Sequence, residues 1–129
     1  DFGIILQGGM YNGVVRALQL LGLADAFGES QVPLYVLNVT YPIVPDELAG
    51  FCAGKRAVLI VEEGQPDFIE QNIVTLLRRA DLQTHVHGKD CLPMAGEYTG
   101  GVLRDGLRKF IRVRRRSARA VRSGRSSRR

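Results

Sequence analysis

The sequence predicts an α/β fold with three layers, in which a mainly parallel sheet of about four strands lies between helices. Apolar runs suited to buried strands alternate with segments whose apolar residues recur at helical spacing. The connections between these segments are short, which favours parallel strands joined by helical crossovers. The run Val58–Val61 is apolar throughout, as expected of a strand buried on both faces.

The first half of the chain supplies two strand–helix units. The expected elements are a strand at residues 3–6, a helix at 10–21, a strand at 34–39 and a short helix that begins at Pro45 and ends before Gly54. Proline suits the first position of a helix, and the acids after it suit the first turn. Gly22 is suited to cap the helix at 10–21.

The second half repeats this alternation. We expect a strand at 57–61, a helix from Pro66 to Ala80, a strand at 84–87 and a final helix capped by Thr99. On the final helix, the residues expected to face inward are Val102, Leu103, Leu107, Phe110 and Ile111. The order is therefore strand–helix repeated four times, which supports the parallel sheet.

Charge divides the chain into two unlike parts. The first 111 residues have nine basic and 13 acidic residues and a net charge of −4, whereas residues 112–129 contain nine Arg and no acid. We expect residues 1–111 to form one α/β domain, because about 110 residues suffice for a single core. We expect residues 112–129 to be a disordered, Arg-rich tail, because like charges repel one another.

Two interpretations of the tail remain open. An Arg-rich arm could bind the phosphate backbone of a nucleic acid. The acidic domain offers nucleic acid no further surface, however, and the monotony of Arg, Ser, Ala, Val and Gly is typical of a shifted reading frame in a GC-rich gene. We therefore expect no nucleic-acid partner. No apolar run is long enough to span a membrane, and we expect a cytoplasmic protein.

Glu62 and Glu63 follow the strand at 57–61, at the end where parallel α/β sheets tend to carry function. One of them could act as a general acid or base. The interpretation we favour is structural: a carboxylate that accepts hydrogen bonds from loop or helix N–H groups and so fixes the turn before Pro66. Gly8 and Gly9 lie at the first strand-to-helix turn, where backbone N–H groups could face an anion, although turn glycines are the ordinary explanation.

Further candidates are weaker. Tyr41 opens a stiff loop, residues 41–45, between the strand at 34–39 and the helix that begins at Pro45, and this loop could line a cleft, form a subunit contact or be a rigid connection only. His85 and His87 lie on one face of a strand, with Cys91 close behind, but no further Cys or His completes a zinc site. We therefore expect no metal and no catalytic or cofactor-binding residue here. Gly8, Gly9, Tyr41, Glu62 and Glu63 stand as candidate cleft or interface residues.

Four segments carry a family resemblance: GIILQGGMYN from Gly3, PLYVLNVTYPIVPDE from Pro33, FCAGKRAVLIVEEGQPDFIEQ from Phe51 and HGKDCLPMAGEYT from His87. They span nearly all of residues 3–111 and resemble the indolepyruvate ferredoxin oxidoreductases of the 2-oxoacid:ferredoxin oxidoreductase family. The matching region of that family resembles the C-terminal domain of transketolase. The resemblance ends at Arg112.

The resemblance implies a structural and interface domain of an enzyme that oxidatively decarboxylates arylpyruvates to acyl-coenzyme A. The whole enzyme would use thiamine diphosphate, Mg²⁺, [4Fe–4S] clusters and coenzyme A, with none of these held by this chain. Its partners would be the remaining domains, ferredoxin and a second copy in a homodimer. We expect the chain to be a fragment of that enzyme and to be inactive alone, because it also begins two residues before a core strand.

Two rivals remain: an independent binding module with a nucleic-acid-binding tail, and a small self-sufficient enzyme built on Glu62 and Glu63. In the transketolase-like fold a further strand commonly precedes the first one seen here. Without it, we expect residues 3–6 to be an open sheet edge and the isolated chain to be marginally soluble.

Overall fold

A computed structural model describes residues 2–26, 29–37, 45–63, 68–93 and 98–127, with the side chains of residue 68 and of residues 114–127 left out. Four parallel strands form one sheet: β1 (Phe2–Gln7), β2 (Leu34–Leu37), β3 (Ala57–Val61) and β4 (His85–His87). The helices are α1 (Tyr11–Leu20), α2 (Pro45–Cys52), α3 (Phe68–Arg79) and α4 (Gly100–Ser127), with the short 3-10 helix η1 (Gly8–Met10) before α1. This is the predicted α/β fold with its predicted order of elements.

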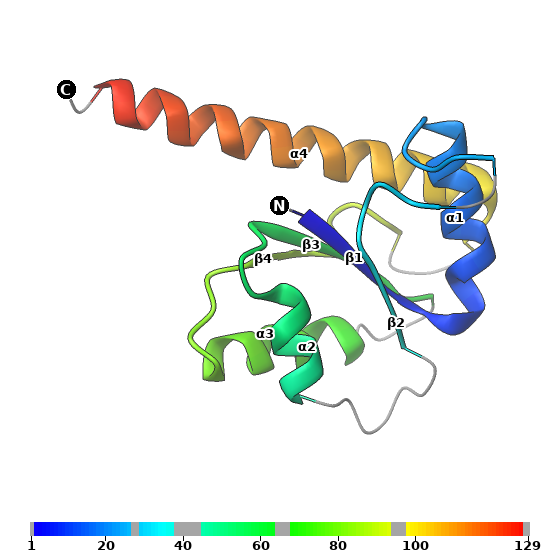
Figure 1. Ribbon diagram of the computed structural model, residues 1–129, viewed down its shortest axis with the longest axis horizontal. Coiled ribbons are helices and arrows are strands. Elements are labelled where there is room, and N and C mark those ends of the chain that lie inside the picture. The colour runs from blue at the N-terminus through cyan, green and yellow to red at the C-terminus, as the bar shows by residue number, and fades with distance from the viewer. Residues whose placement is uncertain (1, 27–28, 38–44, 64–67, 94–97, 128–129) are drawn as a thin grey trace.

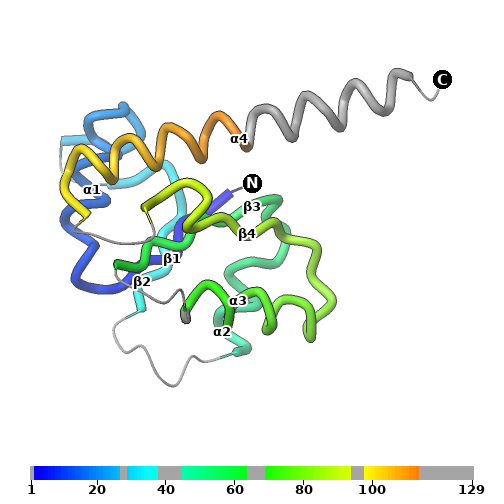
Figure 2. The backbone as a smooth tube through the Cα atoms, turned by 180° about the vertical axis from the view of Figure 1, so that it is seen from behind, coloured from blue at the N-terminus to red at the C-terminus, as the bar shows by residue number. Residues whose placement is uncertain are grey.

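Helices cover both faces of the sheet, as Figures 1 and 2 show from opposite sides. Successive side chains of a strand point to opposite faces. β1 and β3 therefore contribute side chains to two hydrophobic cores, one on each face of the sheet. Ile4, Leu6 and Leu59 pack with α1 and α4, whereas Ile5, Val58 and Ile60 pack with α2 and α3. All five residues of β3 are buried, which accounts for the apolar run in the sequence.

The strand order is β2-β1-β3-β4, so β1 lies inside the sheet. Gly3 to Leu6 pair with β3, and Ile4 to Gln7 pair with β2. The expectation of an open edge at residues 3–6 is therefore wrong. The chain crosses from β1 to β2 on one side and then returns past β1 to form β3. β1 therefore has a neighbour on each side, and the edge strands are β2 and β4.

The connections on the two sides of β1 run in opposite directions. The chain leaves β1 toward β2 in one direction and reaches β3 and β4 in the other. In α/β proteins, ligands commonly bind beyond the carboxyl ends of the two strands at which such a reversal occurs. We call the carboxyl ends of β1 and β3, with residues 7–9 and 62–63, the switch-point edge.

The predicted caps and inward faces are largely present. Thr99 Oγ1 accepts a hydrogen bond from the Val102 N–H at 3.4 Å. On α4 itself, Leu103, Leu107 and Phe110 are buried. Gly22 and Gly54 have φ of 76° and 79°, as expected of glycines that end helices. The helix expected to reach Ala80 ends one residue earlier, at Arg79, and Ala80 is exposed.

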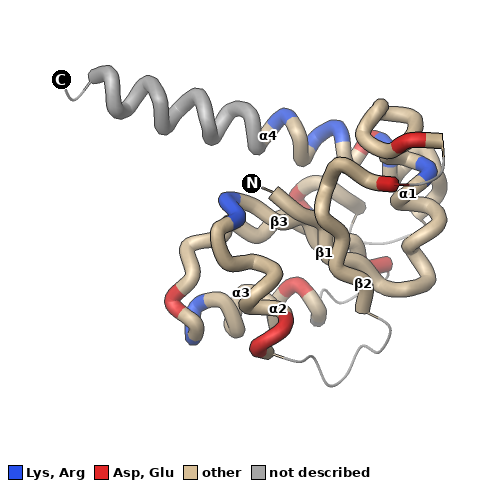
Figure 3. Tube along the Cα trace, viewed as in Figure 1, with Lys and Arg blue, Asp and Glu red and all other residues tan. Residues whose placement is uncertain are grey.

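Helix α4 continues to Ser127, whereas the Arg-rich composition predicts disorder from Arg112. The backbone difference has a simple reason. Extending an existing helix adds one hydrogen bond per residue without a new nucleation cost, and Arg and Ala are good helix formers. The division into a domain at 1–111 and a separate tail stays a prediction. Figure 3 shows basic residues along the part of α4 whose side chains are described.

Candidate functional site at the switch-point edge

The switch-point edge brings together four of the five candidate residues. Gly8 and Gly9 follow β1 in η1, and Glu62 and Glu63 follow β3. Leu6 pairs with Val61, so the two segments leave the sheet side by side. The fifth candidate, Tyr41, lies outside the described residues.

Glu62 is buried, with 5% of its surface exposed. Its Oε2 accepts a hydrogen bond from the Ile69 N–H at 2.8 Å, and its Oε1 accepts one from the Glu70 N–H at 3.2 Å. Both donors belong to the first turn of α3, where N–H groups have no partner within the helix and the helix dipole favours a negative charge. Glu62 therefore joins β3 to α3, as the structural interpretation of the sequence proposed.

Glu63 is exposed, but it joins the neighbouring segments of the same edge. Its N–H donates to Gln7 Oε1 at 3.0 Å, which ties the ends of β1 and β3 together. Its Oε2 accepts a hydrogen bond from the Tyr98 N–H at 2.7 Å, just before α4. Both carboxylates thus accept hydrogen bonds from backbone N–H groups: Glu62 from the first turn of α3, and Glu63 from Tyr98, just before α4.

Lys89 completes this network from the loop after β4. Its Nζ donates to the Glu62 carbonyl oxygen and to the Tyr98 hydroxyl, the latter at 2.5 Å. The Tyr98 hydroxyl donates in turn to the Pro93 carbonyl at 2.6 Å. Together with the Gln7 hydrogen bond, this network holds three connections at one edge of the sheet: those that follow β1, β3 and β4.

The sequence alone predicts no role for Lys89, Tyr98 or Gln7. Lys89 and Tyr98 do lie in HGKDCLPMAGEYT, one of the segments that carries the family resemblance. Their partners are loop backbone atoms, which hydrophobic periodicity does not locate. The family segment was therefore the one sequence signal for these residues, and it did not reveal which atoms they contact.

Gly8 and Gly9 lie in the turn into α1, but nothing among the described residues marks them as an anion site. A Cβ at Gly9 would have no atom within 4 Å, so close packing does not require glycine at that position. Neither residue is among those with positive φ. Their role at the cleft or interface stays a prediction.

A second cluster lies beside the network, in the turn after β4. His87 Nδ1 is 2.7 Å from Asp90 Oδ2, and the Gly88 N–H donates to Asp90 Oδ1 at 2.7 Å. The ligand atoms of His87, Asp90 and Cys91 all lie within 4.8 Å of one another. The spacing in the sequence groups His85 with His87 and Cys91, but among the described residues the cluster contains Asp90 in place of His85.

The surroundings of the cluster shift the pKa values of Asp90 and Cys91. Burial opposes the ionised form of Asp90, but the hydrogen bonds from His87 and the Gly88 N–H hold the pKa of its carboxyl below the ordinary value. Burial first, and then the charges of Asp90 and Glu70, raise the pKa of the Cys91 thiol to about 11, although Lys109 opposes them. Cys91 is therefore a thiol at neutral pH.

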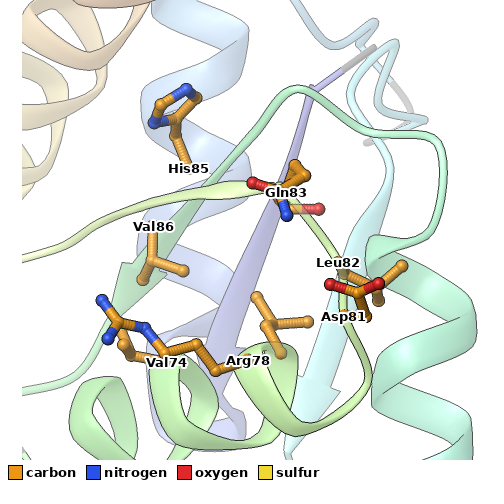
Figure 4. Close-up of a pocket in the computed structure, with 9 residues that line it drawn as sticks. Val74, Arg78, Asp81, Leu82, Gln83, His85 and Val86 are labelled. Atoms are coloured by element: carbon orange, nitrogen blue, oxygen red, sulfur yellow. The ribbon is translucent and has the colours of Figure 1, made fainter.

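The described residues also form a cavity of about 510 Å³, at the amino end of β4 rather than at the switch-point edge. Figure 4 shows Val74 and Arg78 of α3 beside it, with Asp81 and Leu82 from the turn that follows. His85 and Val86, adjacent on β4, point in opposite directions in the same view. Among the described residues, none of the candidates Gly8, Gly9, Glu62 and Glu63 lines this cavity, so it adds nothing to the site at the switch-point edge.

Comparison with curated proteins relates the chain to one kind of enzyme subunit. It is 37% identical over 109 residues to the indolepyruvate oxidoreductase subunit IorA of Methanothermobacter marburgensis, covering 83% of this chain and 16% of the relative. The corresponding subunits of Methanothermobacter thermautotrophicus and Thermococcus kodakarensis are each 33% identical over 109 residues, again over 16% of their length.

The chain is thus homologous to part of an enzyme, a region of the indolepyruvate oxidoreductase subunit IorA, and spans about a sixth of the relatives it matches. No family model matches it, and no solved structure matches it. Among the described residues, no helix combines the length and the hydropathy that a membrane crossing requires.

Proposed function

We propose that this chain is a structural and interface domain of a thiamine diphosphate-dependent indolepyruvate:ferredoxin oxidoreductase, inactive when separated from the rest of that enzyme. The observation that carries the proposal is the match of 109 residues, at 37% identity, to one stretch of a relative about six times longer. The proposed domain type is that of the transketolase C-terminal domain, and an all-parallel sheet between two helical layers is consistent with it.

The bonding at the switch-point edge supports an architectural role. Each oxygen of Glu62 already accepts a hydrogen bond from α3, and the Lys89 ammonium is shared between the Glu62 carbonyl and the Tyr98 hydroxyl. A general base needs a lone pair directed at a substrate proton. The Glu62 oxygens are directed at backbone N–H groups of α3. This geometry suits a residue that keeps the edge rigid where a neighbouring domain contacts it.

The cysteines do not fit an iron–sulfur cluster. A [4Fe–4S] cluster is held by four thiolates, and this chain has two cysteines in all. Cys91 packs in the core beneath α1 and α4, whereas Cys52 packs in the core on the opposite face of the sheet. We therefore propose that the clusters belong to other parts of the enzyme, together with thiamine diphosphate, its Mg²⁺ and the coenzyme A site.

The proposed partners follow from this assignment. The remaining domains of the enzyme cover the switch-point edge, ferredoxin accepts the electrons elsewhere on the assembly, and two copies of the enzyme form a homodimer. The proposed location is the cytoplasm.

A chimera tests the interface role. The aligned segment of the Methanothermobacter marburgensis subunit is replaced by residues 2–110 of this chain, and the assembled enzyme is assayed for indolepyruvate oxidation. We expect a rate within about tenfold of the parent, equivalent to about 1.4 kcal/mol in barrier height. The matched control replaces the same segment by a Gly/Ser linker and should be inactive. A chimera that assembles normally without turnover would contradict the proposal, as would an active linker variant.

A further inference from the structure

The turn after β4 folds three side chains of different chemistry onto one point. The Cys91 N–H donates to the Gly88 carbonyl at 2.9 Å, and the Leu92 N–H donates to the same oxygen at 2.8 Å. This tight turn returns Asp90 and Cys91 toward the ring of His87 at the end of the strand. One imidazole, one carboxylate and one thiol thus lie together, with their ligand atoms within 4.8 Å of one another.

The three groups are oriented by the surrounding structure. The ring of Phe110 packs edge-on against the ring of His87, with centroids 5.7 Å apart. The Gly88 N–H fixes the Asp90 carboxylate, as described above. A Cβ at Gly88 would come 1.9 Å from Glu70 Oε1, so a side chain at this position would displace the Glu70 carboxylate.

The cluster is accessible on one side and enclosed on the other. The side chain of Asp90 is 55% exposed and that of His87 is 17% exposed, whereas Cys91 is buried, with 8% of its surface exposed. A cation could therefore approach from the side of Asp90 and meet the thiol at the base. The charges that act on Cys91 are those of Asp90 and Glu70, both negative, and of Lys109, which is positive.

We propose that His87, Asp90 and Cys91 form a binding site for a divalent cation of the zinc class. Thiolate and imidazole ligands favour Zn²⁺ over Mg²⁺ or Ca²⁺, and three protein ligands leave a fourth position for water or for a group from a partner. Bonds of about 2.0–2.3 Å place the ligands of tetrahedral zinc roughly 3.3–3.8 Å apart. Side-chain rotations satisfy that geometry when the widest pair closes by up to about 1.5 Å. His87 must at the same time give up its 2.7 Å hydrogen bond to Asp90 Oδ2, because two ligand atoms of one zinc ion lie farther apart than that.

Coordination changes the protonation of one group. Cys91 loses its thiol proton to solvent as the sulfur–metal bond forms, and His87 binds as the neutral imidazole. No electron is transferred. Affinity should therefore rise with pH in the neutral range. The site is separate from the proposed interface role, since none of its three side chains takes part in the network of Glu62, Glu63 and Tyr98.

The chain contains its own matched controls, because it has two histidines and two cysteines. His85 lies on the same strand as His87 but outside the cluster, and Cys52 lies in the opposite core. The tag-free full chain is titrated with Zn²⁺ against a chromophoric chelator, and with Co²⁺ to observe the sulfur-to-cobalt charge-transfer absorption. We expect one equivalent of metal per chain and a charge-transfer band.

His87→Gln and Asp90→Asn should each weaken Zn²⁺ binding at least about tenfold, and Cys91→Ser should remove the charge-transfer band. His85→Gln and Cys52→Ser should bind as the wild type does. Asp90 is largely exposed, so its variant is expected to fold even if Cys91→Ser does not. Binding that survives His87→Gln and Asp90→Asn would overturn the proposal, and so would a wild-type cobalt complex without the sulfur band.

Discussion

Replacing Glu62 by alanine is expected to destabilise the fold by about 2–4 kcal/mol. The substitution removes two hydrogen bonds from a charged acceptor, each worth roughly 1.5–3 kcal/mol, and the losses are not fully additive. It also leaves the Ile69 and Glu70 N–H groups of α3 without their acceptor. Urea denaturation of the full chain, followed by far-UV circular dichroism, measures the change.

Glu63→Ala is the matched control, because Glu63 is the adjacent residue of the same type. It is exposed and its side chain accepts one hydrogen bond, from the Tyr98 N–H, so the expected loss is at most about 1 kcal/mol. If Glu62 were instead a catalytic carboxylate in an unfavourable environment, its removal would leave stability unchanged or raise it. A neutral or stabilising Glu62→Ala would therefore contradict the structural role.

Phe110→Ala is expected to cost about 3–5 kcal/mol, as for other large-to-small substitutions in a core. Phe110 is completely buried, and its ring packs edge-on against Phe2 at 5.5 Å between centroids and against His87 at 5.7 Å. These contacts join α4 to the amino end of β1 and the carboxyl end of β4. The unfolding free energy of the variant in urea tests whether α4 is part of the core up to this residue.

Arg108→Ala provides the comparison on the same helix. Arg108 is exposed, and its removal should change stability by no more than about 0.5 kcal/mol. Equal effects at positions 108 and 110 would show that α4 does not pack on the sheet as described here.

The elements were predictable where one physical constraint determines the pattern. The strand at 57–61 was predicted with its observed bounds, because burial on both faces requires an unbroken apolar run. The helix at 10–21 was predicted slightly long, since Gly8–Met10 form a 3-10 turn and the α-helix occupies Tyr11–Leu20. Helical periodicity does not distinguish these two kinds of turn at a helix start.

The strand order was not predictable in the same way. The expected edge at residues 3–6 is an interior strand, because β2 pairs with one side of β1 and β3 with the other. The order depends on the direction in which each crossover passes over the sheet. Periodicity within a segment carries no information about that direction.

The candidate site was predictable in kind but not in detail. A carboxylate bonded to helix N–H groups was the favoured interpretation of Glu62 and Glu63, and the structure assigns that role to Glu62. The choice between them depends on the position of α3 relative to β3. Asp90 was missed because only the turn at Gly88 brings its carboxylate to His87, and a search for Cys and His alone does not include it.

We propose that the reaction centre lies in other parts of the enzyme and that this chain only supports it. The most direct test incubates the purified chain with indolepyruvate, coenzyme A, thiamine diphosphate, Mg²⁺ and oxidised ferredoxin, with an intact indolepyruvate oxidoreductase as the positive control. We predict no ferredoxin reduction above the rate without protein. Reduction that co-purifies with the chain through successive columns would contradict the account.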